Sequence, residues 1–122
     1  MAEWRTEEPS PFVATHHLIG NVRIAFTGRD EARAVSYLAA VHRARRAGAV
    51  VDELIRARYL DRLVRRAGRW QFAERWLVYD WSKVLPADEQ PWWPSGSLEG
   101  APGEADPAAR FLDGADPPFA EH

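Results

Sequence analysis

Residues 70–82 read WQFAERWLVYDWS, and this stretch decides between the two folds open to the chain. Its large apolar side chains alternate with smaller or polar ones: Trp70, Phe72, Trp76 and Val78 against Gln71, Ala73 and Arg75. A period of two together with many aromatic residues is typical of a β-strand. We therefore expect the aromatic side chains of this stretch to lie in the core: Trp70, Phe72, Trp76 and Trp81.

Three evenly spaced glycines lie before residues 70–82 and divide that part of the chain into segments of similar length. Gly28, Gly48 and Gly68 are 20 residues apart, and each lies in a polar cluster suited to a turn. Residues 18–26 form another alternating stretch before the first of these glycines. This spacing leaves room for long antiparallel strands that are joined as a meander.

The same region also carries helical signals. Asp30 is a good N-cap, and residues 31–46 and 51–66 both place apolar side chains on one helical stripe. The alternative is therefore an Arg-rich helical hairpin over residues 30–66. We give the strands more weight because the helical signal reflects a bias in composition. Lys83 is the only lysine among 16 basic residues, so the others are arginine, and alanine is abundant. Arginine and alanine raise helix propensity in any fold.

Charge divides the 122-residue chain into parts. Residues 20–82 carry 13 Arg against seven acidic residues, whereas residues 83–122 carry two basic residues against eight acidic ones and seven of the nine prolines. The length allows one domain. We expect an N-terminal leader at 1–13, a sheet domain at 14–85 and an acidic Pro/Gly-rich tail at 86–122.

Several classes of protein are excluded by composition and spacing. The chain has no cysteine, no apolar run that approaches the length of a bilayer span, and no apolar signal segment at its N-terminus. Its glycines fit no phosphate-binding motif, and its histidines have no metal-ligand spacing: His16, His17, His42 and His122. We expect a cytoplasmic protein with no metal, no cofactor and no membrane partner.

Three segments carry a resemblance to a known family: THHLIGNV (15–22), RYLDRLVRRAGRW (58–70) and QFAER followed by VYDW (71–81). They resemble the C-terminal half of SnoaL-like proteins of the nuclear transport factor 2-like superfamily, which includes scytalone dehydratase and polyketide cyclases. The resemblance implies an α+β fold with a bent antiparallel four-stranded sheet, a cone or half-barrel. The strands would lie near 16–27, 32–46, 50–66 and 69–82.

This sequence departs from the family in one respect: only fourteen residues precede Thr15, too few for most of the family's N-terminal helices. A bare sheet with one uncovered apolar face is unfavourable in water. We expect either a truncated reading frame or a chain that completes its core by self-association, as a dimer or trimer.

His17 and His42 form the strongest candidate site. If the first hairpin turns at Arg29 and Asp30, these two histidines are equidistant from the turn and lie directly opposite each other. The resemblance implies that both line a pocket, with His17 as base and His42 as acid or orienting partner. Imidazole suits this chemistry because it accepts and donates protons near neutrality.

A coincidental pairing of polar side chains is the alternative reading of this site. The opposite face, with Leu18, Val22 and Ile24, is the more apolar one unless a β-bulge redirects the histidines. The choice between His16 and His17 as the pocket residue also stays open.

Four further residues are candidates for the same site. Tyr59 is a candidate donor to a substrate carbonyl. Arg75 either binds a substrate carboxylate or pairs with Glu74 or Asp61. Asp80 either orients a histidine or ends a strand, and Asn21 is a further candidate for substrate binding.

The expected function is that of a cofactor-free lyase, isomerase or cyclase acting on a small apolar carbonyl compound. The first alternative is a non-catalytic SnoaL-like module, truncated or a pseudoenzyme, that binds a small ligand or a protein partner. A more remote alternative is an Arg-rich nucleic-acid binder. The net charge of −2 and the pI of about 6.1 oppose that last class.

Overall fold

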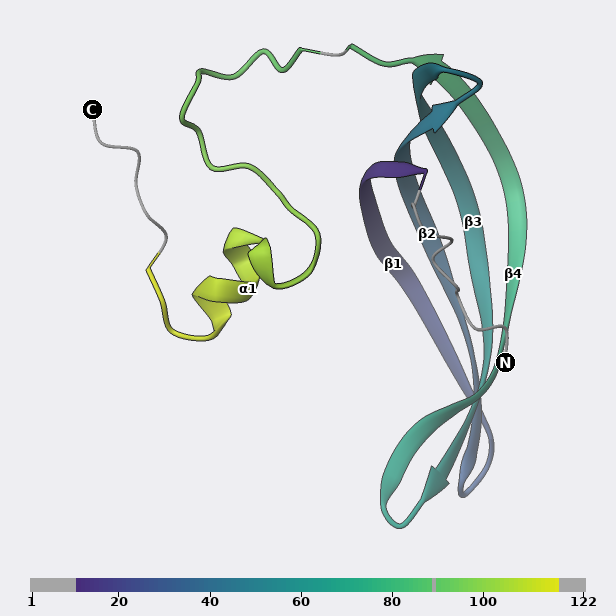
Figure 1. Cartoon of the computed structure of the whole chain (residues 1–122). Helices are drawn as coiled ribbons and strands as arrows, with labels where there is room; N and C mark the ends of the chain where they lie inside the picture. Colours follow the sequence, from purple (N-terminus) through teal and green to yellow (C-terminus); the bar gives the residue numbers. More distant parts are fainter. Residues whose placement is uncertain (1–10, 89, 117–122) are drawn as a thin grey trace. The chain divides into compact units, whose positions relative to one another are not determined.

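The computed structural model describes residues 11–88 and 90–116. Contacts between Cα atoms divide the chain into two units, Met1–Pro86 and Ala87–His122. The first unit is a β-sheet, and the second contains the short 3-10 helix η1 (Gly103–Ala105) and the helix α1 (Pro107–Leu112) (Figure 1). Most of the predicted leader lies outside the described residues.

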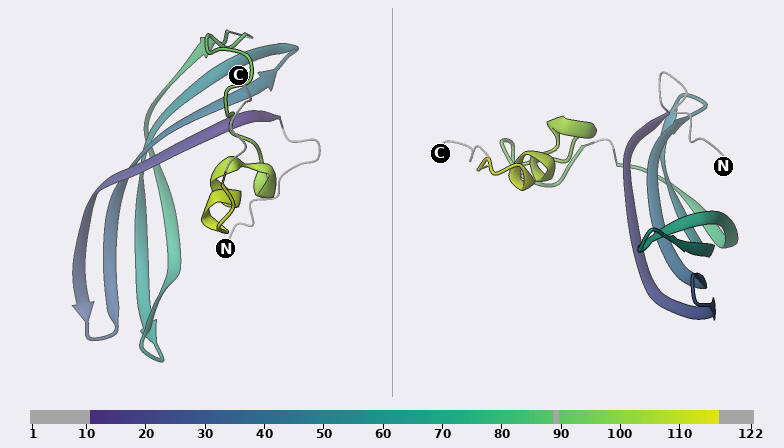
Figure 2. Two further views of the ribbon diagram at one scale, coloured as in Figure 1. Left: turned by 90° about the vertical axis from the view of Figure 1, so that its left-hand side faces the viewer. Right: turned by 90° about the horizontal axis from the view of Figure 1, so that it is seen from below.

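The sheet has four antiparallel strands in the order β1-β2-β3-β4. They are β1 (Phe12–Gly28), β2 (Glu31–Arg46), β3 (Ala49–Arg66) and β4 (Arg69–Pro86). Figures 1 and 2 show that the strands are long and bend together. The predicted bent four-stranded meander is therefore confirmed, and the helical hairpin is wrong.

Two of the predicted glycine turns are two-residue hairpin turns. Ala47 and Gly48 join β2 to β3 with φ angles of 48° and 79°, and Ala67 and Gly68 join β3 to β4 with 51° and 74°. Positive φ at both central residues is the signature of the hairpin turn that matches strand twist. Glycine adopts it without strain, so its position determines where each hairpin reverses.

All irregularities of the sheet lie on its two edge strands. The β2–β3 register runs without interruption from Arg46 opposite Ala49 to Glu31 opposite Val64. Strand β1 contains an extra residue near each end and another between Gly20 and Arg23. Strand β4 contains extra residues at Ala73 and Asp80. Such bulges bend a strand and change which side chains share a face.

One side of the sheet, the histidine face, carries His17, His42 and the even-numbered residues of β2. The other side, the groove face, carries the odd-numbered residues of β2. Because of the bulge in β1, Ile24 and Phe26 lie opposite Ala34 and Ala32 and join the histidine face. The expectation that the histidines lie on the less apolar face is therefore wrong.

The core of the sheet is small and lies on the histidine face. Leu38, Ala40 and Ala57 are buried, and Ile55, Tyr59 and Leu77 pack against them. The aromatic residues predicted to be core are not: Trp70, Phe72, Trp76 and Trp81 are 40%, 61%, 48% and 53% exposed. In the described part of this unit, strands contact only neighbouring strands, so no second layer covers these rings.

The C-terminal unit is held by local contacts. The Asp106 carboxylate accepts hydrogen bonds from the backbone N–H groups of Ala101 and Ala108, at 2.9 and 2.8 Å, and caps α1. These bonds hold the pKa of Asp106 below its usual value. Within the described ranges, no helix has the length and apolar character needed to cross a membrane.

Candidate active site

The two predicted histidines are in direct contact. Their Nε2 atoms are 2.8 Å apart, and the rings stack with centroids 5.1 Å apart and planes inclined by 24°. A hydrogen bond between two Nε2 atoms requires that one carries the proton and the other accepts it. The contact therefore joins a proton donor and a proton acceptor in one unit.

The strand register brings the histidines together diagonally, and the predicted direct pairing is wrong. His17 lies opposite Ala40, and His42 lies opposite Thr15. The turn is where the sequence predicts it, but two extra residues in β1, one before Gly28 and one after Gly20, each slide the register by one position. Two such shifts keep both rings on one face, and diagonal neighbours remain within side-chain reach.

His16, the adjacent histidine, lies opposite Val41. Neighbouring residues of a strand point to opposite faces, so His16 belongs to the groove face. The structure thus selects His17 as the member of this pair that meets His42.

His42 is surrounded by three further side chains. The ring of Phe12 packs against it at 4.9 Å between centroids. Glu53 lies directly opposite His42 on β3, and its Oε1 accepts a hydrogen bond from Arg46 at 2.9 Å. Arg46 in turn lies over the Phe12 ring, 5.7 Å from its centroid. The ring of His42 thus contacts Phe12 and His17 of β1, and the charges of Arg46 and Glu53 act on it from β2 and β3.

Burial is the largest cause that lowers the pKa of His42, and the charge of His17 acts in the same direction. Glu53 opposes this shift, whereas Arg46 adds to it. Burial disfavours the charged imidazolium and thereby favours the neutral imidazole of His42. A neutral ring is what a proton acceptor or relay requires.

Sequence reasoning missed Glu53, Arg46 and Phe12 as neighbours of the site. The predicted turn at Gly48 already contains the signal for Glu53, because residues equidistant from Ala47 and Gly48 face each other across β2 and β3. The contacts of Phe12 and Arg46 depend on an irregular start of β1, which has no comparable signal.

Tyr59 and Arg75 form a second cluster on the histidine face. Arg75 binds Asp61 with two hydrogen bonds of 2.7 and 3.0 Å, and Asp61 is 6% exposed. The Arg75 guanidinium also lies 3.9 Å from the centroid of the Tyr59 ring. Of the two roles predicted for Arg75, the structure therefore shows the ion pair with Asp61.

This cluster is separate from the histidine pair. Tyr59 lies opposite Ser36, four residues along β2 from Ala40, which faces His17. At about 3.4 Å per residue, the two strand positions are about 14 Å apart. The apolar residues of the core lie between them, including Leu38 and Ala57.

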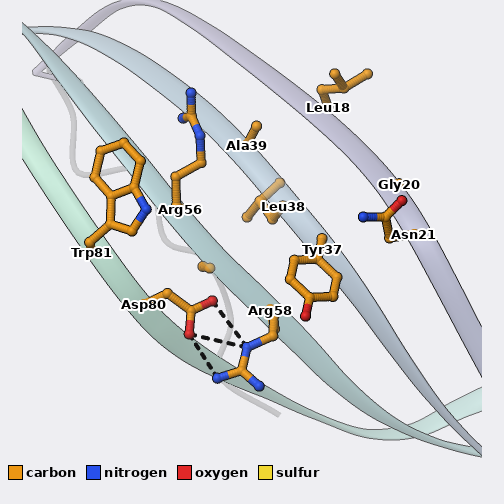
Figure 3. A pocket seen from close by; sticks show the side chains of 11 residues that line it. Leu18, Gly20, Asn21, Tyr37, Leu38, Ala39, Arg56, Arg58, Asp80 and Trp81 are labelled. Atoms are coloured by element: carbon orange, nitrogen blue, oxygen red, sulfur yellow. Dashed lines mark hydrogen bonds and ion pairs between the residues drawn. The ribbon is translucent and has the colours of Figure 1, made fainter.

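The remaining two candidates, Asn21 and Asp80, line a pocket of about 600 Å³ that the groove-face side chains form (Figure 3). Asp80 binds Arg58 through hydrogen bonds of 2.7, 3.0 and 3.1 Å. The structure therefore does not bring Asn21 and Asp80 to the histidine pair. Among residues 11–88 and 90–116, no three His, Asp or Glu side chains gather as a metal-binding group.

Comparisons with known proteins agree with this architecture. A family model described as a SnoaL-like domain matches residues 1–76. A search of curated proteins found no match.

Three solved structures show similar folds. A type 2 hexachlorocyclohexane dehydrochlorinase is 21% identical with a TM-score of 0.56, over 70% of this chain and 55% of that one. A putative scytalone dehydratase from Novosphingobium aromaticivorans is 26% identical with a TM-score of 0.53, over 75% and 58%. The type 3 dehydrochlorinase of Novosphingobium barchaimii is 20% identical with a TM-score of 0.56, over 71% and 56%. This chain thus spans little more than half the length of these proteins.

Proposed function

Because the chain belongs to the SnoaL-like domain family, we propose that it is a cofactor-free lyase, isomerase or cyclase that uses His17 and His42 for acid–base chemistry. The observation that carries the proposal is the 2.8 Å contact between their Nε2 atoms. The names of the similar structures, a dehydratase and dehydrochlorinases, describe eliminations, and these support the lyase form of the proposal.

The proposed reaction begins at His17. A substrate binds beside the rings and leaves their Nε2 contact in place. His17 takes a proton from the carbon next to a carbonyl and passes a proton to His42 across that contact. His42 orients the pair and relays the proton to the departing hydroxyl, which leaves as water, while the C–H electrons form the new double bond. The pair regains its starting state, so no cofactor is consumed.

An apolar carbonyl compound fits the surface beside the pair. Between the histidines and the Tyr59 cluster, the partly buried Ile55 and Leu77 pack against the buried Leu38, Ala40 and Ala57, and these side chains carry no charge. Tyr59 is the proposed donor to a second carbonyl of the substrate at the far end of this strip, because the carbonyl next to the reacting carbon lies at His17. Asn21 and Asp80 have no part in this reaction, because they line the groove-face pocket.

The proposal is tested by proton exchange at the α-carbon of 2-tetralone in D2O, followed by proton NMR with the full chain. We expect the protein to accelerate exchange above buffer, and His17→Ala to reduce this acceleration about a hundredfold. His16→Ala is the matched control, because it removes the adjacent imidazole from the other face. Equal losses in the two variants, or no acceleration by the wild type, would contradict the proposal.

The second candidate is a non-catalytic module that binds a small ligand or a protein partner. It is favoured by large apolar side chains exposed on the histidine face, such as Phe26 at 72% and Ile24 at 56%. A covering partner, including a second or third copy of this chain, would remove them from water. Sedimentation of the full chain distinguishes a dimer or trimer from a monomer.

Two other aspects belong to the same proposal. A cytoplasmic location is supported by the absence of cysteine from the sequence, which fits a reducing compartment. Nucleic-acid binding has less support, because many arginines are neutralised by carboxylates across the strands, for example Arg58 by Asp80 and Arg62 by Glu74.

A further inference from the structure

We propose that the groove face carries a second ligand site, independent of the histidine pair, that binds a small, flat, apolar molecule bearing one carboxylate. The site is the pocket of about 600 Å³ to which all four strands contribute (Figure 3). This volume is in the range of ordinary small-molecule sites, which combine an apolar surface with a few polar groups.

The apolar part of the site comes from three strands. Leu18 of β1 and Ala39 of β2 line it together with the rings of Tyr37 and Trp81 (Figure 3). Tyr37 is 50% exposed and Trp81 is 53% exposed, so both rings are accessible to a ligand. Flat aromatic walls favour a flat apolar ligand.

The bulge at Asp80 is what assembles one side of this pocket. The extra residue breaks the alternation of β4, so that two consecutive side chains, Asp80 and Trp81, both line it. Asp80 then neutralises Arg58. The charge that remains among the lining side chains is that of Arg56.

Arg56 differs from the ion-paired arginines around it. Its Nη1 donates to the carbonyl oxygen of Ile55 at 3.1 Å, and its guanidinium lies over the Trp81 ring, 5.2 Å from the centroid. No carboxylate of the described residues is bonded to it. A guanidinium presents paired N–H groups that match a carboxylate, and a neighbouring ring leaves those groups available. The pocket is thus complementary to one negative charge.

The opposite end of the pocket is polar, and its charges are those of the Arg58–Asp80 ion pair, which balance. Asn21 lies there near Tyr37, whereas Arg56 and Trp81 lie at the other end (Figure 3). Asn21 is held at φ 49° by the bulge of β1, a backbone conformation that L-residues rarely adopt. Its amide offers both a donor and an acceptor to the end of a ligand away from the carboxylate.

The test uses 2-naphthoate as the probe, titrated into the full chain while the indole N–H signals are followed by NMR. The Trp81 signal is assigned with Trp81→Phe. We expect saturable binding that shifts the Trp81 signal, and we expect Arg56→Gln to weaken it by about tenfold or more, because charged hydrogen bonds are lost. The neutral analogue 2-naphthamide should bind about tenfold more weakly than the acid.

Three controls make the result specific. Arg62→Gln removes an arginine of the same face that is paired with Glu74 and does not line the pocket, and it should bind the probe like the wild type. His17→Ala should also bind normally, which separates this site from the proposed catalytic pair. If Arg56→Gln does not fold, Arg56→Lys keeps the charge but loses the paired donors and should bind with intermediate strength.

The proposal is overturned by any of three results. The first is no saturable binding of 2-naphthoate, and the second is equal binding of the acid and the amide. The third is binding that His17→Ala weakens and Arg56→Gln does not. A self-associated chain that buries Trp81 and excludes the probe would overturn it as well.

Discussion

The two faces of the sheet are built from the same four strands but carry their charges differently. On the groove face, arginines pair with carboxylates across neighbouring strands at the surface, as Arg62 does with Glu74. On the histidine face, the carboxylate of Asp61 is buried, and Arg75 both pairs with it and packs on Tyr59. Similar side-chain chemistry therefore has a different energetic weight on each face, because burial removes the water that would otherwise replace a lost partner.

The largest effect is expected where a buried charge loses its partner. Arg75→Ala leaves the Asp61 carboxylate without its two hydrogen bonds, and we expect the free energy of unfolding to fall by about 2–3 kcal/mol. Urea denaturation measures this loss. Arg62→Ala is the matched control on the groove face, where the loss should stay below about 1 kcal/mol. Equal losses would show that the two faces do not differ.

A smaller effect on stability is expected at Asn21. It lies in the bulge between Gly20 and Arg23, which determines the face on which the later residues of β1 lie. Asn21→Val places a β-branched residue at a φ of 49°, and we expect a loss of about 1–2 kcal/mol in the free energy of unfolding. Asn21→Gly accepts the same φ without strain and should keep the wild-type stability or exceed it. Urea midpoints of the two variants check this, and a Val variant as stable as the Gly variant would contradict the bulge.

The smallest effect is the dependence of stability on pH through His42. The pKa of His42 is lower in the folded chain than its usual 6.5, so between the two values the unfolded chain binds more protons. Stability from this group is therefore present above about pH 6.5 and lost as the pH falls through the folded pKa. We expect a lower Tm at pH 5 than at pH 7, and a smaller difference in His42→Asn.

The carboxyl group of Asp52 does not obscure this window. Arg43 lowers the pKa of Asp52 through a hydrogen bond, so Asp52 titrates below its usual 3.8. A Tm difference between pH 7 and pH 5 that His42→Asn leaves unchanged would assign the effect to another group.

The sequence was sufficient to predict the meander and its turns, because glycine spacing and alternating side chains are local properties. Gly48 and Gly68 end their strands where expected, and the β2–β3 pairing follows directly from the first of these turns. The contact between His17 and His42 was also predicted, although through the wrong register. Two slips of one residue leave the faces unchanged, which is why the incorrect alignment still selected the same pair.

The rest depended on features without a local signature. A bulge adds one residue at little local cost, and nothing in the residues around Asp80 shows that Asp80 and Trp81 will line the same pocket. Exposure of the aromatic residues was missed for a different reason. An alternating pattern predicts which side chains share one face of a strand. It does not predict whether another layer packs on that face, because that layer comes from distant segments or from another chain.

Every extra residue of the sheet lies on β1 or β4, and this affects how the edges of two such sheets could pair. These are the two margins of the sheet, where a strand from another molecule would add by backbone hydrogen bonding. On β1, the longest run in regular register with β2 is Ala14–Gly20, and a bulge interrupts the strand on either side. An incoming strand would lose its alignment after a few residues at either margin. Continuous growth of the sheet from molecule to molecule is therefore disfavoured, and any self-association would use the broad faces.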